Sequence, residues 1–245
     1  MPRLFSRLLE PVYHLWSPVF LLRAGLASSR LPKPTDAPVV HIDGPDPDRL
    51  LVAGGGIVVG FGVLSHELGI AGHLARLVSG ATGRGVKVDI IAESDFRIDD
   101  VGWRIRDITL SAYDAIVLFI GVTDAIRYTP ARSWHRHLSA VVDNISARAA
   151  AGARIFVVGI QPIRLVTTLN NRAGFLAELH ARGLDRESIR VCSQRPNASF
   201  VPFRPSLEAT DRYRSSTIYR NWAALVSPPI VEALTMNHPL EDFTI

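Results

Sequence analysis

The stretch Leu50-Leu51-Val52-Ala53-Gly54-Gly55-Gly56-Ile57-Val58-Val59-Gly60-Phe61-Gly62 shows how this chain is built. A short apolar run leads into three glycines and then into a second apolar run. This order indicates a buried strand, a tight turn and the start of a helix. In open parallel sheets, ligands bind where strands end in this way, so the turn at 54–56 is the first candidate site.

The rest of the chain repeats the alternation of strand and helix signals. Short apolar runs rich in β-branched residues predict further strands at 86–92, 115–120 and 154–160 and near 199–201. Helical patterns fall between and after them, near 65–80, 97–109, 130–150, 170–183 and 217–226. The alternation predicts an α/β fold in which helices cover both faces of a parallel sheet.

Two proline-containing segments predict helix boundaries. Thr129-Pro130 is a start signal, with Thr129 as the cap and Pro130 at the first helical position. Ser227-Pro228-Pro229 is expected to break the last helix, because proline removes a backbone donor and clashes with the preceding turn.

Composition limits the classes of function. The 245 residues are 47% hydrophobic, which suits one sizeable core, and the formal charge is +4. Residues 1–37 hold five basic side chains against two acidic ones, so the remaining body is close to neutral. This balance argues against a nucleic-acid partner, which would need a basic face. The only lysines are Lys33 and Lys87, so nearly all positive charge is guanidinium, which cannot act as a base.

The N-terminal part differs from the body. Apolar residues recur at near-helical spacing between Phe5 and Leu22, but Pro11 and Pro18 interrupt the run and Arg23 ends it. The run is shorter than the roughly 20 apolar residues of a bilayer span and is a poor signal peptide. Two interpretations remain for the extension at 1–37: a helix packed on the body, or peripheral membrane contact through residues 3–23.

The expected domain plan follows. Five prolines among residues 31–48 indicate an extended segment, so residues 38–48 are predicted to be a linker and residues 49–245 a single domain. The single Cys192 excludes an intrachain disulfide and fits a reducing compartment. The predicted localisation is cytoplasmic, with membrane association as the alternative.

The residues just after each predicted strand resemble the four sequence blocks of the SGNH/GDSL hydrolases, which are serine esterases and lipases. Gly54-Gly55-Gly56 stands where that family has Gly-Asp-Ser, and Ser94-Asp95 stands where it has an oxyanion-binding glycine. Gly121-Val122-Thr123-Asp124 matches Gly-x-Asn-Asp, and Asp211-Arg212-Tyr213-Arg214 matches Asp-x-x-His. The resemblance covers roughly residues 49–235 and implies a three-layer α/β/α fold with a flavodoxin-like sheet.

The replacements remove the chemistry that the resemblance would imply. Acyl transfer by this route needs a hydroxyl nucleophile, a base and donors for the oxyanion. Gly56 has no side chain, and Arg214 cannot accept a proton. Asp95 places a negative charge where the oxyanion would form, and Thr123 reaches less far than asparagine. Asp211 alone matches the triad.

We therefore expect a catalytically degenerate protein whose cleft binds an acyl, lipid or anionic ligand, or a protein partner of unknown kind. The residues expected around that cleft are Gly54, Gly55, Gly56, Ser94, Asp95, Gly121, Thr123, Asp124, Asp211 and Arg214. A further hypothesis is that Arg214 fills the old site by pairing with Asp95 or Asp211. No cofactor or metal is expected, because His135 and His137 lack a metal-ligand spacing.

Two other functions stay open. One is an esterase or acyltransferase with rearranged catalytic residues, in which Ser94, Ser215 or Ser216 is a displaced nucleophile and a histidine arrives from elsewhere in the fold. The other is nucleotide binding through Gly54-x-Gly56-x-x-x-Gly60, with Glu93 as a ribose partner.

Overall fold

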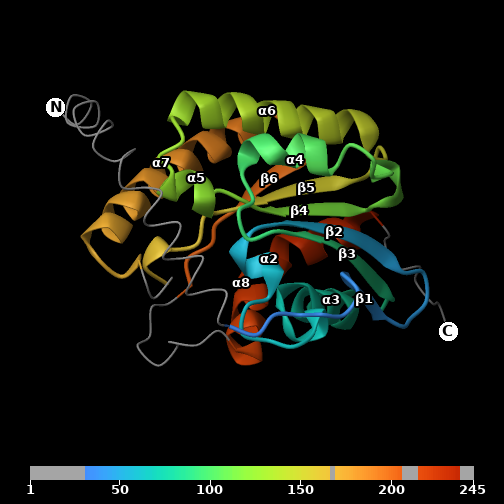
Figure 1. Ribbon diagram of the computed structural model, residues 1–245. Coiled ribbons are helices and arrows are strands. Elements are labelled where there is room, and N and C mark those ends of the chain that lie inside the picture. The colour runs from blue at the N-terminus through green and yellow to red at the C-terminus, as the bar shows by residue number, and fades with distance from the viewer. Residues whose placement is uncertain (1–30, 166–168, 206–214, 238–245) are drawn as a thin grey trace.

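A six-stranded sheet runs through the centre of the protein, with helices on both of its faces (Figure 1). This is a computed structural model, and it describes residues 31–165, 169–205 and 215–237. The strands are β1 (Val39–Ile42), β2 (Asp48–Gly54), β3 (Val86–Ala92), β4 (Ala115–Phe119), β5 (Arg154–Val158) and β6 (Ala198–Val201). Their order in the sheet is β1-β3-β2-β4-β5-β6, and all neighbours are parallel except β1 and β3.

The parallel strands confirm the predicted flavodoxin-like sheet. Counted from β2, they follow the order 2-1-3-4-5, in which the chain reverses direction across the sheet beside the first strand. All five residues of β4 are buried, as expected for a strand with helices on both sides. Gly54 pairs with Ala92 of β3 and with Phe119 of β4, so these three strands end level with one another.

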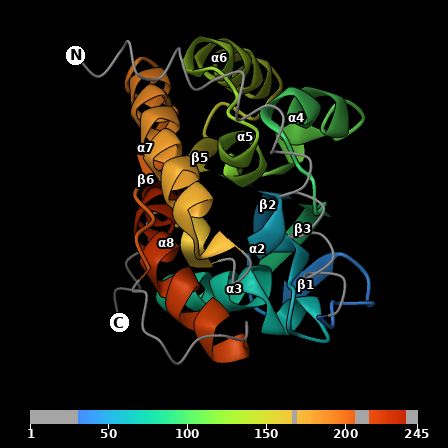
Figure 2. The same ribbon diagram turned by 60° about the vertical axis from the view of Figure 1, so that its left-hand side comes forward.

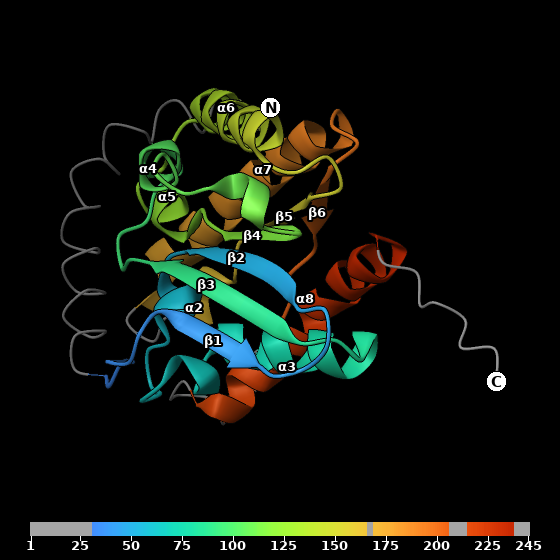
Figure 3. The same cartoon turned by 90° about the vertical axis from the view of Figure 1, so that its right-hand side faces the viewer.

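The helices form two layers, which Figures 2 and 3 show from other directions. One layer holds α4 (Ile98–Arg104), α5 (Val122–Ile126), α6 (Ala131–Arg148) and α7 (Arg172–Ser193). The other holds α2 (Gly56–Val59), α3 (Ile70–Thr82) and α8 (Ser216–Asn237). Short 3-10 turns η1 (His66–Leu68), η2 (Leu110–Ala112) and η3 (Ile163–Leu165) join these elements.

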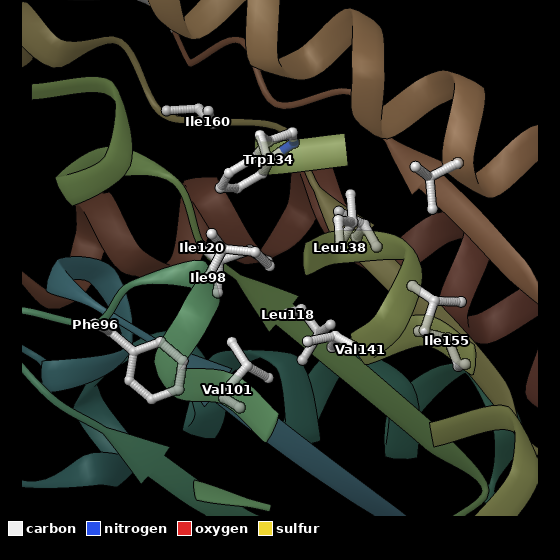
Figure 4. Packing of buried hydrophobic residues seen from close by; sticks show 14 of the residues in the cluster. Phe96, Ile98, Val101, Leu118, Ile120, Trp134, Leu138, Val141, Ile155 and Ile160 are labelled. Atoms are coloured by element: carbon white, nitrogen blue, oxygen red, sulfur yellow. The ribbon is translucent and has the colours of Figure 1, made fainter. Parts of the chain in front are cut away.

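Each layer buries its own hydrophobic core against one face of the sheet. Figure 4 shows the first core, in which Trp134, Leu138 and Val141 of α6 pack over Leu118 and Ile155 of the sheet. In the second core, α3 and α8 pack on each other and on the opposite face of the sheet. The predicted three-layer α/β/α architecture is therefore confirmed.

Residues 38–48 contribute a strand to the sheet as well as connecting to it. Val40 is almost fully buried, and β1 pairs antiparallel with β3 from Val39 to Ile42. The backbone N–H of Ile90 donates to the carbonyl of Pro38, so this pairing starts at the proline itself. Four residues between proline-rich turns give too short a pattern to stand out as a strand in the sequence.

The expected break at Ser227-Pro228-Pro229 is wrong. Helix α8 continues through Pro228 and Pro229 to Asn237. Val226, Ile230 and Leu234 lie on one face of this helix and are completely buried, so packing against the core outweighs the lost backbone hydrogen bonds. Helix α7 likewise extends ten residues past its predicted end at 183, because Leu184 and Val191 continue its buried face.

Among the described residues, no helix combines the length and the apolar character that crossing a bilayer requires. The apolar residues between Phe5 and Leu22 lie outside this part of the chain.

Candidate functional site

The glycine turn lies at the end of β2 and is tied to both neighbouring strands. Gly55 N donates to the Phe119 carbonyl at 3.1 Å, and Glu93 N donates to the Gly54 carbonyl at 3.2 Å. A Cβ atom on Gly54 would lie 2.1 Å from the Phe119 carbonyl oxygen, so only glycine allows β2 and β4 to approach this closely. A Cβ on Gly55 would meet nothing nearer than 3.5 Å. Packing therefore requires glycine at 54 but not at 55.

The helix after the turn is too short to support the nucleotide-binding hypothesis. Helix α2 is a single turn, Gly56–Val59, and it is followed by Gly60, whose backbone is left-handed with φ 75°. Phosphate sites of this type use the N-terminus of a longer helix, whose aligned peptide dipoles favour the negative charge. Glu93, the expected ribose partner, forms an ion pair with Arg104. Neither feature favours a nucleotide at this turn.

The loop after β3 carries Ser94 and Asp95, and both are exposed. The Asp95 carboxylate pairs with Arg127, with 2.8 Å between Oδ2 and Nη2. The partner of Asp95 within the described residues is thus an arginine that follows α5. Asp211 and Arg214 lie outside the described residues, so their proposed pairing stays a prediction.

The loop after β4 depends on another glycine. Gly121 has φ 104°, a conformation that other residues rarely adopt. A Cβ atom there would lie 2.6 Å from Ile160 Cδ1 and 2.9 Å from the Trp134 ring. Figure 4 shows Ile160 and Trp134 close together above this end of the sheet. Thr123 follows in α5 and is buried.

Asp124 is the last residue of the Gly121–Asp124 block, and its side chain makes hydrogen bonds inside the fold. Its completely buried carboxylate accepts hydrogen bonds from Ile98 N at 3.1 Å and from Thr129 Oγ1 at 2.9 Å. Burial raises the pKa of Asp124 to about 6, against the lowering effect of these two bonds. The carboxylate therefore ties the start of α4 to the connection between α5 and α6.

The prediction that Thr129 caps α6 is wrong, and the contact with Asp124 explains why. Thr129 does not cap the helix, since its hydroxyl donates to Asp124. Pro130 occupies the N-cap position, one residue before the predicted place, and Ala131 begins the helix.

A serine and a histidine that the sequence did not connect lie side by side. His73 Nε2 is 2.8 Å from Ser216 Oγ. His73 belongs to the first turn of α3, and Ser216 begins α8, where both helices start at the carboxyl edge of the sheet. Burial, followed by the charges of Arg76 and Arg220, lowers the pKa of His73. Sequence reasoning placed Ser216 near the site but found no histidine for it, because the two residues are 143 positions apart.

A second group that sequence reasoning missed is Gln161, which follows β5 at the same edge. Its side chain is 2% exposed, and neither amide atom has a hydrogen-bond partner. Unpaired buried amides are costly and uncommon, so Gln161 is a candidate for contact with a water or a ligand at this edge.

An open pocket lies elsewhere, at the start of α7. It encloses about 470 Å³ and is lined by Arg164, Asn170, Asn171, Arg172, Phe175 and Leu176. None of the residues predicted for the cleft lines it. In the described parts of the chain, no group of three or more histidine, cysteine or acidic side chains is placed to hold a metal ion.

Solved structures share this arrangement of sheet and helices. An acetyl xylan esterase from Geobacillus stearothermophilus matches with a TM-score of 0.52 at 15% identity, over 78% of this chain and 96% of that one. A lipase/acylhydrolase from Enterococcus faecalis matches with 0.56 at 13%, over 76% and 96%. A putative lipolytic protein of the G-D-S-L family from Desulfitobacterium hafniense matches with 0.53 at 14%, over 73% and 97%.

The chain therefore has the α/β/α fold of the SGNH/GDSL hydrolases, as its sequence blocks predicted. No protein-family model and no curated protein matches its sequence. At these identities the likeness establishes the fold, and function has to be argued from the residues of the site.

Proposed function

We propose that this protein is a catalytically degenerate member of the SGNH/GDSL-like fold, and that its former ester-binding cleft binds a ligand or a partner without hydrolysing it. The observation that carries the proposal is Gly56, which begins α2 and which stands, by the sequence resemblance, where the family has its nucleophile. A glycine supplies no hydroxyl, so no acyl-enzyme can form there.

Two further residues support the loss of ester chemistry. Asp95, at the oxyanion position, is an exposed carboxylate held by Arg127, so this position offers negative charge where the reaction needs a neutral donor. Arg214 occupies the position of the base in the sequence pattern and stays protonated at any physiological pH. The expected ligand is an acyl chain, a lipid or an anion, by analogy with the substrates of esterases and lipases.

The test is hydrolysis of short and medium p-nitrophenyl esters by the purified protein. We expect no turnover from the natural protein and a measurable gain from the double variant Gly56→Ser/Arg214→His. Asp211→Ala, added to that double variant, should remove the gain, because the histidine would lose its orienting carboxylate. Turnover by the natural protein that Asp211→Ala abolishes would show that the cleft still catalyses hydrolysis and would refute the proposal.

The alternative is an active esterase or acyltransferase with rearranged residues. The specific observation in its favour is the 2.8 Å contact between Ser216 Oγ and His73 Nε2. A serine and a histidine at this distance are the first requirement of nucleophilic catalysis. Activity toward p-nitrophenyl esters that Ser216→Ala removes, and that Ser193→Ala at the exposed end of α7 leaves unchanged, would establish this alternative.

A further inference from the structure

Five groups surround the contact between α3 and α8, and we refer to them as the His73 cluster. They are His73, Arg76, Ser216, Arg220 and the backbone carbonyl of Glu67. His73 and Ser216 are half-buried, whereas Arg76 and Arg220 are exposed. The cluster is therefore reachable from solvent while its central hydrogen bond is partly shielded.

Arg76 is held firmly in this cluster. Its Nη2 donates to the Glu67 carbonyl at 2.6 Å and to His73 Nδ1 at 3.1 Å, which uses both hydrogens of that nitrogen. The Glu67 carbonyl comes close because Gly72 faces it: a Cβ on Gly72 would lie 2.1 Å from that oxygen. A glycine in the first turn of α3 thus lets η1 supply the acceptor that orients Arg76.

The direction of each hydrogen bond follows from the chemistry of the guanidinium. Arginine has only donors, so His73 Nδ1 must accept and carries no proton. The neutral imidazole then keeps its proton on Nε2 and donates it to Ser216 Oγ. In a catalytic pair the direction is the reverse, because Nε2 must be free to take the serine proton. The distance between His73 and Ser216 is that of a catalytic pair, but the hydrogen bond runs from the histidine to the serine, which is the opposite of what catalysis needs.

Ser216 is left with a proton to donate. Its oxygen accepts from His73, and no other hydrogen bond of this hydroxyl is found among the described residues. Arg220 lies one turn further along α8, on the same face as Ser216. It forms no ion pair with a carboxylate in the described part of the chain. The Ser216 hydroxyl, which can donate a hydrogen bond, and the exposed Arg220 guanidinium therefore lie on the same face of α8.

We propose that Ser216 is a ligand-binding residue rather than a nucleophile: Arg76, acting through His73, fixes its hydroxyl as a donor, and together with Arg220 it binds a carboxylate. Arg76 and His73 are positioning residues in this arrangement. The assignment rests on the proposed ligand-binding function and narrows its ligand to an acyl chain that ends in a carboxylate.

The first measurement is the tautomer of His73, read from long-range ¹H–¹⁵N correlations of histidine-labelled protein and assigned with His73→Asn. We expect the Nε2–H tautomer. Arg76→Glu supplies an acceptor in place of a donor and should convert His73 to the Nδ1–H form. The same change should make Ser216 reactive toward a fluorophosphonate, to which the natural protein stays inert. An Nδ1–H tautomer in the natural protein overturns the proposal.

The second measurement is titration with octanoate, followed through the His73 signals and by calorimetry. Removing a hydrogen bond to a charged ligand should weaken binding about tenfold or more in Ser216→Ala, and Arg220→Gln should act in the same direction. Ser216→Thr should restore affinity, and Ser193→Ala should leave it unchanged. Methyl octanoate has the same chain without the carboxylate, and inorganic phosphate is an anion without the chain. If either of them binds as tightly as octanoate, the carboxylate assignment is refuted.

The outcomes separate this proposal from the broader one. Octanoate binding that neither Ser216→Ala nor Arg220→Gln weakens, or no octanoate binding at all, overturns the assignment of Ser216. The ligand-binding function would still stand in both cases. Ester hydrolysis by the natural protein that depends on Ser216 would overturn both.

Discussion

The buried carboxylate of Asp124 leads to a prediction about the pH dependence of stability. Its pKa rises from 3.8 to about 6, chiefly through burial. One pKa unit corresponds to about 1.4 kcal/mol, so keeping this carboxylate charged costs the folded state about 3 kcal/mol at pH 7.5. Because the folded pKa is raised, the stabilising effect of protonation is present at low pH and is lost as the pH rises through about 6.

Asp124→Asn isolates this contribution. An asparagine here can accept from Ile98 N with its oxygen and donate to Thr129 Oγ1 with its nitrogen, so it keeps a hydrogen bond to both neighbours without the charge. The free energy of unfolding of the natural protein should gain about 2 kcal/mol from this group between pH 7.5 and 4.5, a gain that the variant lacks. Asp185, whose pKa burial also raises to about 6, is present in both proteins and cancels in the difference.

Urea unfolding followed by circular dichroism at pH 7.5, 6.0 and 4.5 measures the effect. The variant should be relatively most stable at pH 7.5 and should lose that advantage toward pH 4.5. Asp107→Asn, at a highly exposed carboxylate beside Arg106, controls for the loss of one negative charge. A difference between variant and natural protein that stays constant within about 0.5 kcal/mol would refute the reasoning, since the expected change is four times larger.

Three further predictions concern packing, each measured by thermal and urea unfolding. Gly54→Ala should destabilise the protein by more than about 3 kcal/mol, because its Cβ would lie 2.1 Å from the Phe119 carbonyl oxygen. Gly55→Ala should change the stability by less than about 1 kcal/mol, because nothing lies within 3.4 Å of its Cβ, and equal effects of the two variants would contradict this. Gly121→Ala should cost roughly 2–4 kcal/mol through its positive φ and its contact with Ile160, and a neutral result would count against it. Gln161→Met should stabilise by about 1 kcal/mol, since it replaces an unpaired buried amide with an apolar side chain of similar size; destabilisation would indicate a bound water or ligand.

The centre of the parallel sheet was predictable because β2, β4 and β5 are buried on both faces, so that their sequences are nearly continuous apolar runs. Strand β4, with all five residues buried, is the clearest case. Strand β1 was missed because its four residues pair with β3 on one side only and leave Val39 partly exposed. The end of α8 was missed for a different reason: local proline chemistry predicts a break, and the buried Ile230 and Leu234 outweigh it through contacts that are distant in the sequence.

The meeting of the strand ends at one edge was predictable, but the side-chain contacts near that edge were not. Chain order alone places Gly54, Ser94 and Gly121 after consecutive strands, and the sheet brings these strand ends to one edge. The contact of Ser216 with His73 depends on how α3 and α8 pack, a relation that spans 143 positions. The direction of this hydrogen bond depends on Arg76, which donates to His73 and is held by the Glu67 carbonyl in η1.

The contrast between Gly54 and Gly55 bears on the proposed loss of ester chemistry. Gly54 is required by the approach of β4, so its presence says nothing about catalysis. Position 55 has room for a side chain and an ordinary extended backbone, with φ −92°, so the fold itself does not exclude an aspartate there. Since backbone geometry does not impose glycine at 55, the missing polar group is a feature of the sequence and not a requirement of the fold. The contacts of Arg76 with His73 and of Arg127 with Asp95 are likewise made by side chains, so on the proposed function the side chains and not the backbone decide between hydrolysis and binding.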